Sequence, residues 1–97
     1  MINESLPPLK SLQAFEAAGR HESFLHAAIE LKVSPGAISR HVQLLEQFLE
    51  TELFVRRSNG VTLTTNGNFY ARRVSRIFRD LRTMTAEVRR LHAPDES

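Results

Sequence analysis

The side chains best suited to contacting another molecule follow Ser34 and Pro35, at the predicted start of a helix. Serine is a preferred N-cap, and proline fits the first helical position because its missing N–H would have no partner there. One face of this helix carries Gly36, Arg40, Gln43 and Gln47, with Ser39 at its edge. Hydroxyl, guanidinium and amide groups hydrogen-bond to base edges in the major groove of DNA. The spacing therefore predicts a helix that reads DNA.

The element that must position this helix comes directly before it. Apolar residues at i, i+3, i+4 and i+7 predict a short helix with one buried face: Phe24, Ala27, Ala28 and Leu31. The period stops at Lys32 and Val33 and restarts at Ser34. The second helix buries the side opposite its polar face, with Ile38, Val42, Leu45 and Leu49. Residues 24–46 thus have the pattern of a helix-turn-helix, with Ser23 as the N-cap of the first helix.

Other residue types that carry chemistry are not arranged for it. The histidines include no HExxH motif and no pair at i, i+4, so no metal site is predicted; they are His21, His26, His41 and His92. Ser39 and His41 point to different helix faces, which argues against a serine–histidine dyad. The chain has no cysteine and no glycine-rich phosphate loop. We expect no cofactor and no enzyme activity.

Length and composition predict one small cytosolic domain. The 97 residues are 41% hydrophobic and 25% charged, and no apolar run is long enough to span a membrane. The charge is uneven, because seven acidic and four basic residues precede Leu53, whereas nine arginines stand against Asp80 and Glu87 between Leu53 and His92. This asymmetry favours a polyanionic partner, although a solvated arginine-rich helix explains it at least as well.

A β-hairpin is predicted after the two motif helices. Two short β-prone runs, residues 53–56 and 61–64, flank Asn59-Gly60, a pair that accepts the positive φ angles of a type I′ turn. A further apolar stripe over residues 9–18 predicts a helix near the N-terminus. Helix, helix-turn-helix and hairpin follow one another in the order of a winged helix. Two arginines beside the hairpin tip suit phosphates or a minor groove: Arg56 and Arg57.

The last segment has a different apolar period. Its apolar residues are spaced alternately by four and three, the heptad pattern of a coiled-coil seam. They are Tyr70, Val74, Ile77, Leu81, Met84, Val88 and Leu91. A helix capped by Thr64 or Thr65 would carry this seam over about 33 Å, too far for one small domain to cover. We expect the same helix of a second chain to cover it; the alternative is that the helix folds back on its own domain.

Together these motifs resemble the N-terminal DNA-binding domain of LysR-type transcriptional regulators, from about Leu9 to Gly67 and then in the linker helix. The residues that carry the resemblance are Leu12, Phe15, Ser23, Phe24, Ala27, Ala28, Leu31, residues 37–40, Leu45, Glu46, Leu53, Phe54, Arg56, Leu63, Thr64 and Gly67. The segments HAAIEL, AISRHV, LEQ, LFVR and LTT look most like the branch with the glycine-cleavage and β-lactamase regulators. The fold class expected is mainly α: a winged helix-turn-helix of three helices and a two-stranded β-hairpin wing, followed by a long linker helix for dimerisation.

The resemblance implies roles for matching residues. Bases would be read from the start of the recognition helix, by Pro35, Gly36, Ser39, Arg40 and Gln43. The DNA backbone or minor groove would be contacted by Ser34, Arg56, Arg57, Asn59 and Thr64. Glu46, which follows the buried Leu45, would be structural. The linker helix would pair antiparallel with that of a second subunit, so that a homodimer binds a double-stranded operator with two-fold related half-sites.

Four positions depart from the family pattern. Pro35 stands where a base-reading glutamine is frequent, and Asn59 where some relatives have a wing-tip arginine. Glu50 replaces a glycine, so a positive φ at this position would cost about 1 kcal/mol. Asn66 replaces a small residue near the start of the linker helix, where it can help to cap that helix.

The predicted organisation is a winged helix-turn-helix over residues 1–64, a linker helix over 65–92 and a tail over 93–97. Family members continue into an effector-binding domain, which we expect to be absent from this chain; the chain is either an excised fragment, which we favour, or a naturally short relative. A small-molecule inducer would act only on a full-length protein, in the cytoplasm at the nucleoid. Two alternatives stay open: a self-contained winged-helix repressor of another family, and a winged helix that contacts an acidic protein.

Overall fold

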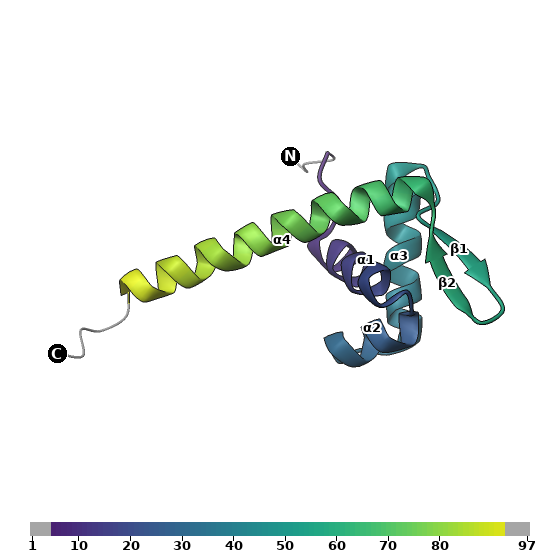
Figure 1. The fold of residues 1–97 in the computed structure, drawn as a ribbon, viewed down its shortest axis with the longest axis horizontal. Coiled ribbons are helices and arrows are strands. Elements are labelled where there is room, and N and C mark those ends of the chain that lie inside the picture. The colour runs from purple at the N-terminus through teal and green to yellow at the C-terminus, as the bar shows by residue number, and fades with distance from the viewer. Residues whose placement is uncertain (1–4, 93–97) are drawn as a thin grey trace.

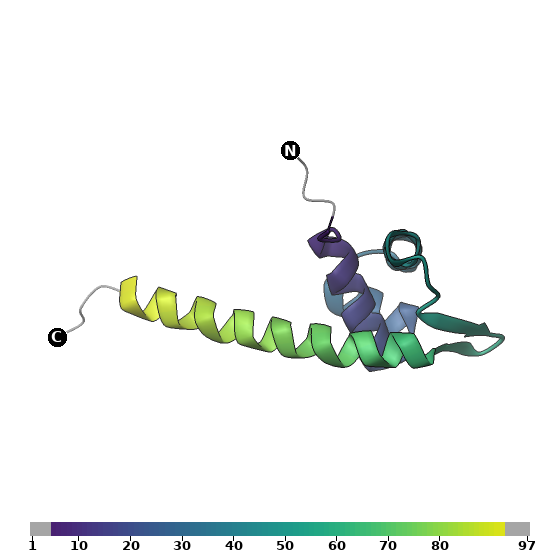
Figure 2. The same ribbon diagram turned by 90° about the horizontal axis from the view of Figure 1, so that it is seen from above.

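The computed structural model describes residues 5–92, which form four helices and one two-stranded antiparallel hairpin (Figure 1). The elements are α1 (Leu9–His21), α2 (Phe24–Leu31), α3 (Pro35–Leu49), β1 (Phe54–Arg57), β2 (Gly60–Leu63) and α4 (Thr65–His92). The first three helices and the wing form a compact unit, and α4 projects away from it in both perpendicular views (Figures 1 and 2). The expected fold class, a winged helix-turn-helix followed by a long helix, is confirmed.

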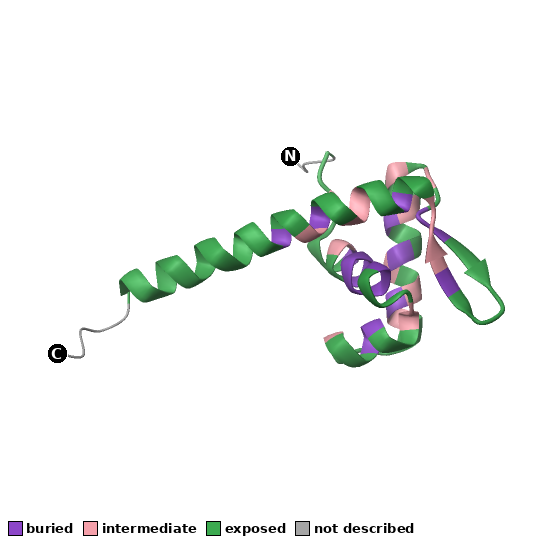
Figure 3. Cartoon of the chain, viewed as in Figure 1, coloured by how far each residue is buried: buried purple, intermediate pink, exposed green. Residues whose placement is uncertain are grey.

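The core is built around α1, which packs against α2, α3 and α4. Because three helices contact it, α1 is buried on nearly all sides, and Phe15 at its centre is fully buried. Its small residues Ala14, Ala17 and Ala18 let the neighbouring helices approach closely, as do Ala27 and Ala28 on α2. The buried positions in Figure 3 accordingly gather on α1 and on the sides of the other elements that face it.

The predicted helix starts are confirmed at α2 and α3. The Ser23 hydroxyl accepts a hydrogen bond from the His26 N–H at 3.0 Å. The Ser34 hydroxyl accepts one from the Ala37 N–H at 3.1 Å, with Pro35 in the first turn of α3. Each cap satisfies one of the N–H groups that the first turn of a helix leaves without an internal partner.

Helices α1, α2 and α3 each end on a charged residue in the left-handed conformation. The φ angles are 52° at Glu22, 60° at Lys32 and 55° at Glu50. A side chain is strained in this region because its Cβ approaches the following carbonyl oxygen, which is why glycine usually occupies such positions. Glu50 therefore does have the positive φ that the family's glycine suggested for this position, and the same geometry recurs at Glu22 and Lys32, two helix ends that the sequence pattern did not single out.

The hairpin is present, but its turn is not the one that the sequence pattern predicts. Arg57 pairs with Gly60, so the two-residue connection is Ser58-Asn59 rather than Asn59-Gly60. A type I′ turn needs positive φ at both central residues, and neither Ser58 nor Asn59 has it. The glycine instead supplies a φ of 141° directly after the turn, at the start of β2.

The start of α4 is fixed by Thr64 and Gly67. The Thr64 hydroxyl accepts a hydrogen bond from the Gly67 N–H at 2.9 Å, so Thr64 is the cap. The side-chain hydrogen bond of Asn66 joins it to the chain after α3 instead of capping α4: its amide nitrogen donates to the Thr51 hydroxyl at 3.1 Å. A Cβ on Gly67 would lie 2.0 Å from the carbonyl oxygen of Leu53. The absence of a side chain at Gly67 thus allows the helix to cross the chain that leads into the wing.

The predicted apolar seam of α4 is divided between two surroundings. Val74 is only 5% exposed in the core of its own domain, and Tyr70 packs against the same core, with its ring 5.6 Å from that of Phe15. The prediction of one uninterrupted seam for a partner is therefore wrong at these two residues. From Ile77 onward the seam residues are exposed, and the helix does not fold back over its own domain (Figure 3).

Candidate nucleic-acid interface

The polar face of α3 is free of the protein core. Gly36, Arg40 and Gln43 are exposed, as is Pro35 at the helix start, whereas Ser39 is half-buried at the edge of the face. The opposite face is held in the core by Ile38, Val42 and Leu45. In Figure 1 the N-terminal end of α3, together with α2 and the tip of the wing, lies on the side of the domain away from α4. These groups thus share a side that α4 does not cover.

The start of α3 suits an anion. Unpaired N–H groups and the helix dipole make this end of a helix partly positive. The Ser34 hydroxyl uses a lone pair to accept from the Ala37 N–H, so its own hydrogen remains to be donated outward. Ser34 is exposed, so the hydroxyl is accessible to a ligand. Arg40 lies one to two turns further along the same helix and adds a full positive charge.

The wing presents Arg56 beside the start of α2. The guanidinium carbon of Arg56 lies 4.8 Å from the centre of the Phe24 ring. Phe24 in turn packs edge-to-face against Phe54 of β1, with ring centres 5.4 Å apart and an interplanar angle of 87°. These contacts join the helix-turn-helix to the wing, so Arg40 and Arg56 are presented by elements that are packed together.

The remaining wing candidates differ in what they can offer. Arg57 is exposed and donates from Nε to the Thr62 hydroxyl at 3.4 Å, and Asn59 is exposed at the turn. Thr64 requires a correction. Its hydroxyl donates to the Glu52 carbonyl at 2.8 Å and its N–H donates to the Leu53 carbonyl at 2.9 Å. A phosphate only accepts hydrogen bonds, so Thr64 has no donor left for it in this conformation.

Glu46 holds the wing against the recognition helix. Its Oε2 accepts hydrogen bonds from the N–H groups of Leu53 at 2.8 Å and Phe54 at 3.3 Å. Glu46 thus satisfies two backbone donors where the chain leaves α3 and enters β1. The structural role implied for Glu46 by the family resemblance is confirmed, and its carboxylate is turned toward the backbone rather than toward a ligand.

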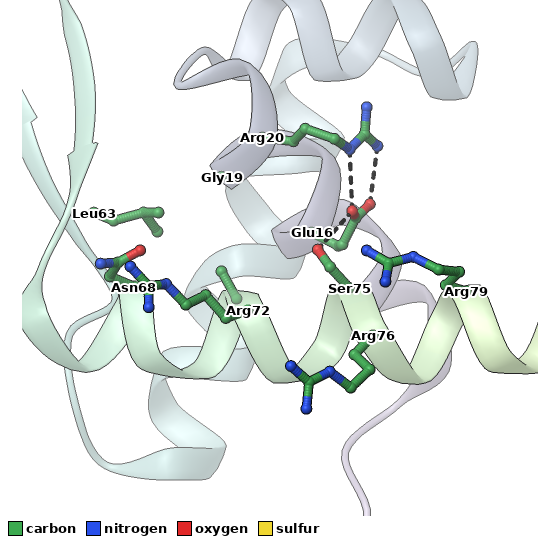
Figure 4. Close-up of a pocket in the computed structure, with 10 residues that line it drawn as sticks. Glu16, Gly19, Arg20, Leu63, Asn68, Arg72, Ser75, Arg76 and Arg79 are labelled. Carbon is green, nitrogen blue, oxygen red and sulfur yellow. Dashed lines mark hydrogen bonds and ion pairs between the residues drawn. The ribbon is translucent and has the colours of Figure 1, made fainter.

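A network of charged side chains joins α1, α2 and α4, and it was not predicted from the sequence. Arg20 donates to both oxygens of Glu16 at 3.0 and 2.9 Å and to both oxygens of Glu30 at 2.9 and 2.8 Å. His21 contacts Glu30 at 2.7 Å. The Ser75 hydroxyl of α4 donates to Glu16 at 2.9 Å, as Figure 4 shows. Only the i, i+4 spacing of Glu16 and Arg20 was visible in the sequence.

The network changes the acidity of its members. The hydrogen bond from Arg20 lowers the pKa of Glu16, against the opposing effect of burial and with help from Ser75. Hydrogen bonds from Arg20 and then His21 lower the pKa of Glu30 to about 2. The two carboxylates in return raise the pKa of Arg20. Arg20 is therefore a fixed structural cation at the groove between α1 and α4, which Arg72, Arg76 and Arg79 also line. In Figure 4 the Arg79 side chain reaches toward Ser75 and Glu16.

Residues 5–92 also bear on metal binding and on the membrane. Within this part of the chain, no three His, Cys, Asp or Glu residues come together in a way that could hold a metal ion. Nor does this part contain a helix that is both long and apolar enough to cross a membrane.

A capped helix with an exposed polar face, braced by a shorter helix and flanked by an arginine-bearing hairpin, defines a winged helix-turn-helix domain. The family described as bacterial regulatory helix-turn-helix protein, lysR family, matches residues 9–68. The chain belongs to this LysR family.

Relatives and solved structures extend the likeness beyond that segment. The HTH-type transcriptional activator AmpR of Citrobacter freundii is 59% identical over 66 residues, which are 68% of this chain and 23% of AmpR. The glycine cleavage system transcriptional activator of Escherichia coli K12 is 40% identical over 87 residues, 90% of this chain and 28% of that protein. The chain thus spans about a quarter of the length of these curated relatives.

Solved structures of similar proteins include complexes with DNA. The BenM_DBD/catB site 1 DNA complex matches with a TM-score of 0.83 and 27% identity, covering 91% of this chain and 99% of that one. The CbnR_DBD–DNA complex matches with a TM-score of 0.78 and 27% identity, covering 89% of this chain and 99% of that one. Both matches extend over most of α4, so the long helix is shared as well as the winged helix.

Proposed function

We propose that the chain is the sequence-specific DNA-binding part of a LysR-type transcriptional regulator. The observation that carries the proposal is the exposed polar face of α3, presented on the same side of the domain as the wing. In this proposal the start of α3 enters the major groove, where Pro35, Gly36, Ser39, Arg40 and Gln43 lie against base edges. Ser34, Arg56, Arg57 and Asn59 contact the flanking backbone or minor groove. The likeness to BenM_DBD and CbnR_DBD, both solved with DNA, supports this arrangement.

The base-reading part of the proposal is tested at Arg40. Selecting bound duplexes from a random pool gives the preferred half-site and its spacing. Arg40→Ala should then weaken binding to that site by about 1–3 kcal/mol, the contribution of one bidentate base contact. The preference for one base at one position of the site should also be relaxed. Arg79→Ala on α4 removes the same charge far from the reading face and should keep the preference. Unchanged discrimination in Arg40→Ala would count against Arg40 as a reader.

The backbone part is tested at Arg56. Removing one phosphate contact weakens binding to all sequences. It also reduces the slope of log affinity against log salt concentration by about one. Arg56→Ala should therefore lower affinity for cognate and random duplexes alike and flatten the plot of log affinity against log salt. An unchanged slope would remove Arg56 from the phosphate contacts. Failure of the parent protein to bind any duplex would favour the protein-contact alternative.

The proposed assembly is a homodimer through the part of the α4 seam that its own domain leaves exposed. Its exposed apolar residues are Ile77, Leu81, Met84, Val88 and Leu91. An antiparallel pair of such helices buries this stripe and separates two winged helices for two-fold related half-sites. Leu81→Glu should give monomers in analytical ultracentrifugation, whereas Thr83→Glu, on the other side of the same helix, should leave the dimer intact. A persistent Leu81→Glu dimer would contradict the seam.

Properties of a complete regulator are also part of the proposal. The chain corresponds to about a quarter of its curated relatives, so response to a small-molecule inducer would reside in further sequence. A DNA-binding regulator of a bacterial family would work in the cytoplasm, at the nucleoid. A fluorescent fusion of the parent should concentrate at the nucleoid. The variant that combines Arg40→Ala and Arg56→Ala should spread through the cytoplasm instead, and a membrane-bound fusion would contradict this location.

A further inference from the structure

The wing arginine has an aromatic neighbour whose role the proposed function leaves open. Phe54 and Arg56 are two residues apart on β1, so their side chains lie on the same face of the hairpin. That face is turned toward Phe24, the first residue of α2. Phe54 is buried at the inner end of this face, and Arg56 is exposed at the outer end. Phe24 therefore stands between the core and the solvent-facing guanidinium.

The geometry at Phe24 holds the guanidinium by a ring face rather than by an anion. The centre of the Phe24 ring is 4.8 Å from the Arg56 guanidinium carbon, within the range of a cation–π contact. The near-perpendicular packing against Phe54, at 87°, constrains the plane of the Phe24 ring. A long arginine side chain otherwise loses considerable rotamer freedom when it binds a ligand. The ring thus reduces that loss before any ligand arrives.

The type of contact matters for an anionic ligand. Within residues 5–92 the ion pairs of the structure involve Arg20 and His21, and none involves Arg56. A carboxylate partner would occupy the N–H donors and neutralise the charge of Arg56. A ring face occupies neither, so the guanidinium keeps its donors for phosphate oxygens. Arg57, one residue further on, lies on the other face of the hairpin and has Thr62 as its partner instead.

We propose that Phe24 is a positioning residue for DNA binding: its ring holds the Arg56 guanidinium in place, so that the wing and the helix-turn-helix meet the DNA as one prearranged surface. The proposal rests on the proposed function, because it assumes that Arg56 contacts DNA. Phe24 itself touches no base or phosphate in this scheme. Its effect on affinity should pass entirely through Arg56.

A double-mutant cycle tests this dependence. Affinity for the selected duplex is measured for the parent, Phe24→Leu, Arg56→Ala and the double variant. Phe24→Leu keeps an apolar side chain but removes the ring, and should weaken binding by about two- to five-fold. In the Arg56→Ala background the same change should have no further effect. The conservative Phe24→Tyr keeps the ring and should bind like the parent.

A purely structural role for Phe24 predicts a different result. It would weaken binding equally with and without Arg56, and additive losses would overturn the proposal. The matched cycle with Arg57→Ala should be additive, because Arg57 does not contact the ring. If the parent binds DNA and Arg56→Ala weakens it while Phe24→Leu does not, the inference about Phe24 fails and the proposed function stands.

A measurement without DNA keeps the proposal testable if Phe24→Leu does not fold. In the NMR spectrum of the parent, the ring current of Phe24 should shift the Arg56 Nε–H resonance away from that of Arg57. Phe24→Tyr should preserve the shift. Coincident Arg56 and Arg57 resonances in the parent would overturn the proposal whatever the DNA affinity.

Discussion

The first half of α4, up to Phe78, and the second half share one heptad pattern but not one environment. In the first half, Val74 and Phe78 are buried against the domain's own core, and Ser75 reaches the Glu16–Arg20 network. In the second half, all residues from Arg79 to His92 are exposed, including Leu91 at 81%. The difference shows that a single apolar repeat can meet two environments in succession, first the domain's own core and then solvent.

The largest effect that separates the halves is expected at Gly67. In Gly67→Ala the new Cβ would lie 2.0 Å from the Leu53 carbonyl oxygen and 2.9 Å from its carbon, so backbone must move. We expect a loss of about 3 kcal/mol or more in the free energy of unfolding, measured by urea denaturation. Gly36→Ala is the control, because its nearest neighbour would be 3.9 Å away; it should be neutral or stabilising. If Gly67→Ala has the same free energy of unfolding as the parent, the first half of α4 is not anchored at Gly67.

Two valines at equivalent heptad positions compare the halves directly. Val74→Ala empties part of the core and should cost about 2 kcal/mol of unfolding free energy. Val88 is 54% exposed, so Val88→Ala should change the stability of the monomer by less than about 0.5 kcal/mol. Both are measured by thermal denaturation in the Leu81→Glu background, which removes the partner. Equal losses at the two positions would erase the distinction between the halves.

The hydroxyls of Ser75 and Thr85 are expected to give a smaller difference in the free energy of unfolding. The Ser75 hydroxyl donates to the buried Glu16, and Ser75→Ala should cost about 1 kcal/mol in chemical denaturation. The Thr85 hydroxyl donates to the Leu81 carbonyl within the exposed half at 2.7 Å. Thr85→Ala should be neutral or slightly stabilising, because alanine is the better helix former. A cost at Thr85 as large as that at Ser75 would indicate that the second half is packed.

The smallest effect is expected in how the free energy of unfolding changes at acidic pH. The folded-state pKa of Glu30 is lowered from 4.5 to about 2, chiefly by Arg20 and then by His21. Its contribution is therefore present above pH 4.5 and lost as the pH falls toward 2. Because Glu30 is more than one-third exposed, solvent screening keeps this below about 1 kcal/mol.

Glu30→Gln should accordingly flatten the loss of unfolding free energy between pH 4.5 and 2, measured by denaturation at a series of pH values. Glu87→Gln is the control in the second half of α4, where Glu87 has no ion pair among the described residues. It should reproduce the parent curve. A parent-like curve for Glu30→Gln would show that the network does not couple folding to this carboxylate.

Local features of this fold could be predicted from the sequence because their causes are local. Ser23 and Ser34 cap their helices, and α4 runs from Thr65 to His92 as the apolar period indicated. The exposed face of α3 follows from its helical spacing, so Arg40 and Gln43 point outward as expected. The family resemblance added the structural role of Glu46, which spacing alone does not give.

Features that depend on distant residues could not be predicted in the same way. Val74 and Val88 occupy equivalent positions in the repeat, and only the approach of α1 decides which is buried. Glu16 and Ser75 are 59 residues apart and meet only in the folded chain. The candidate site shows the same limit, since the donors of Thr64 are used by the chain between α3 and β1.

The left-handed ends of α1, α2 and α3 leave this domain room for engineering. Glycine at Glu22, Lys32 and Glu50 would relieve roughly 1 kcal/mol at each position, and ends of separate helices should contribute almost independently. A triple-glycine version would then gain about 3 kcal/mol, more than the loss of about 2 kcal/mol expected in Val74→Ala. Such a version would make a tolerant host in which the exposed face of α3 is randomised to select new operator preferences, with fewer library members lost to unfolding.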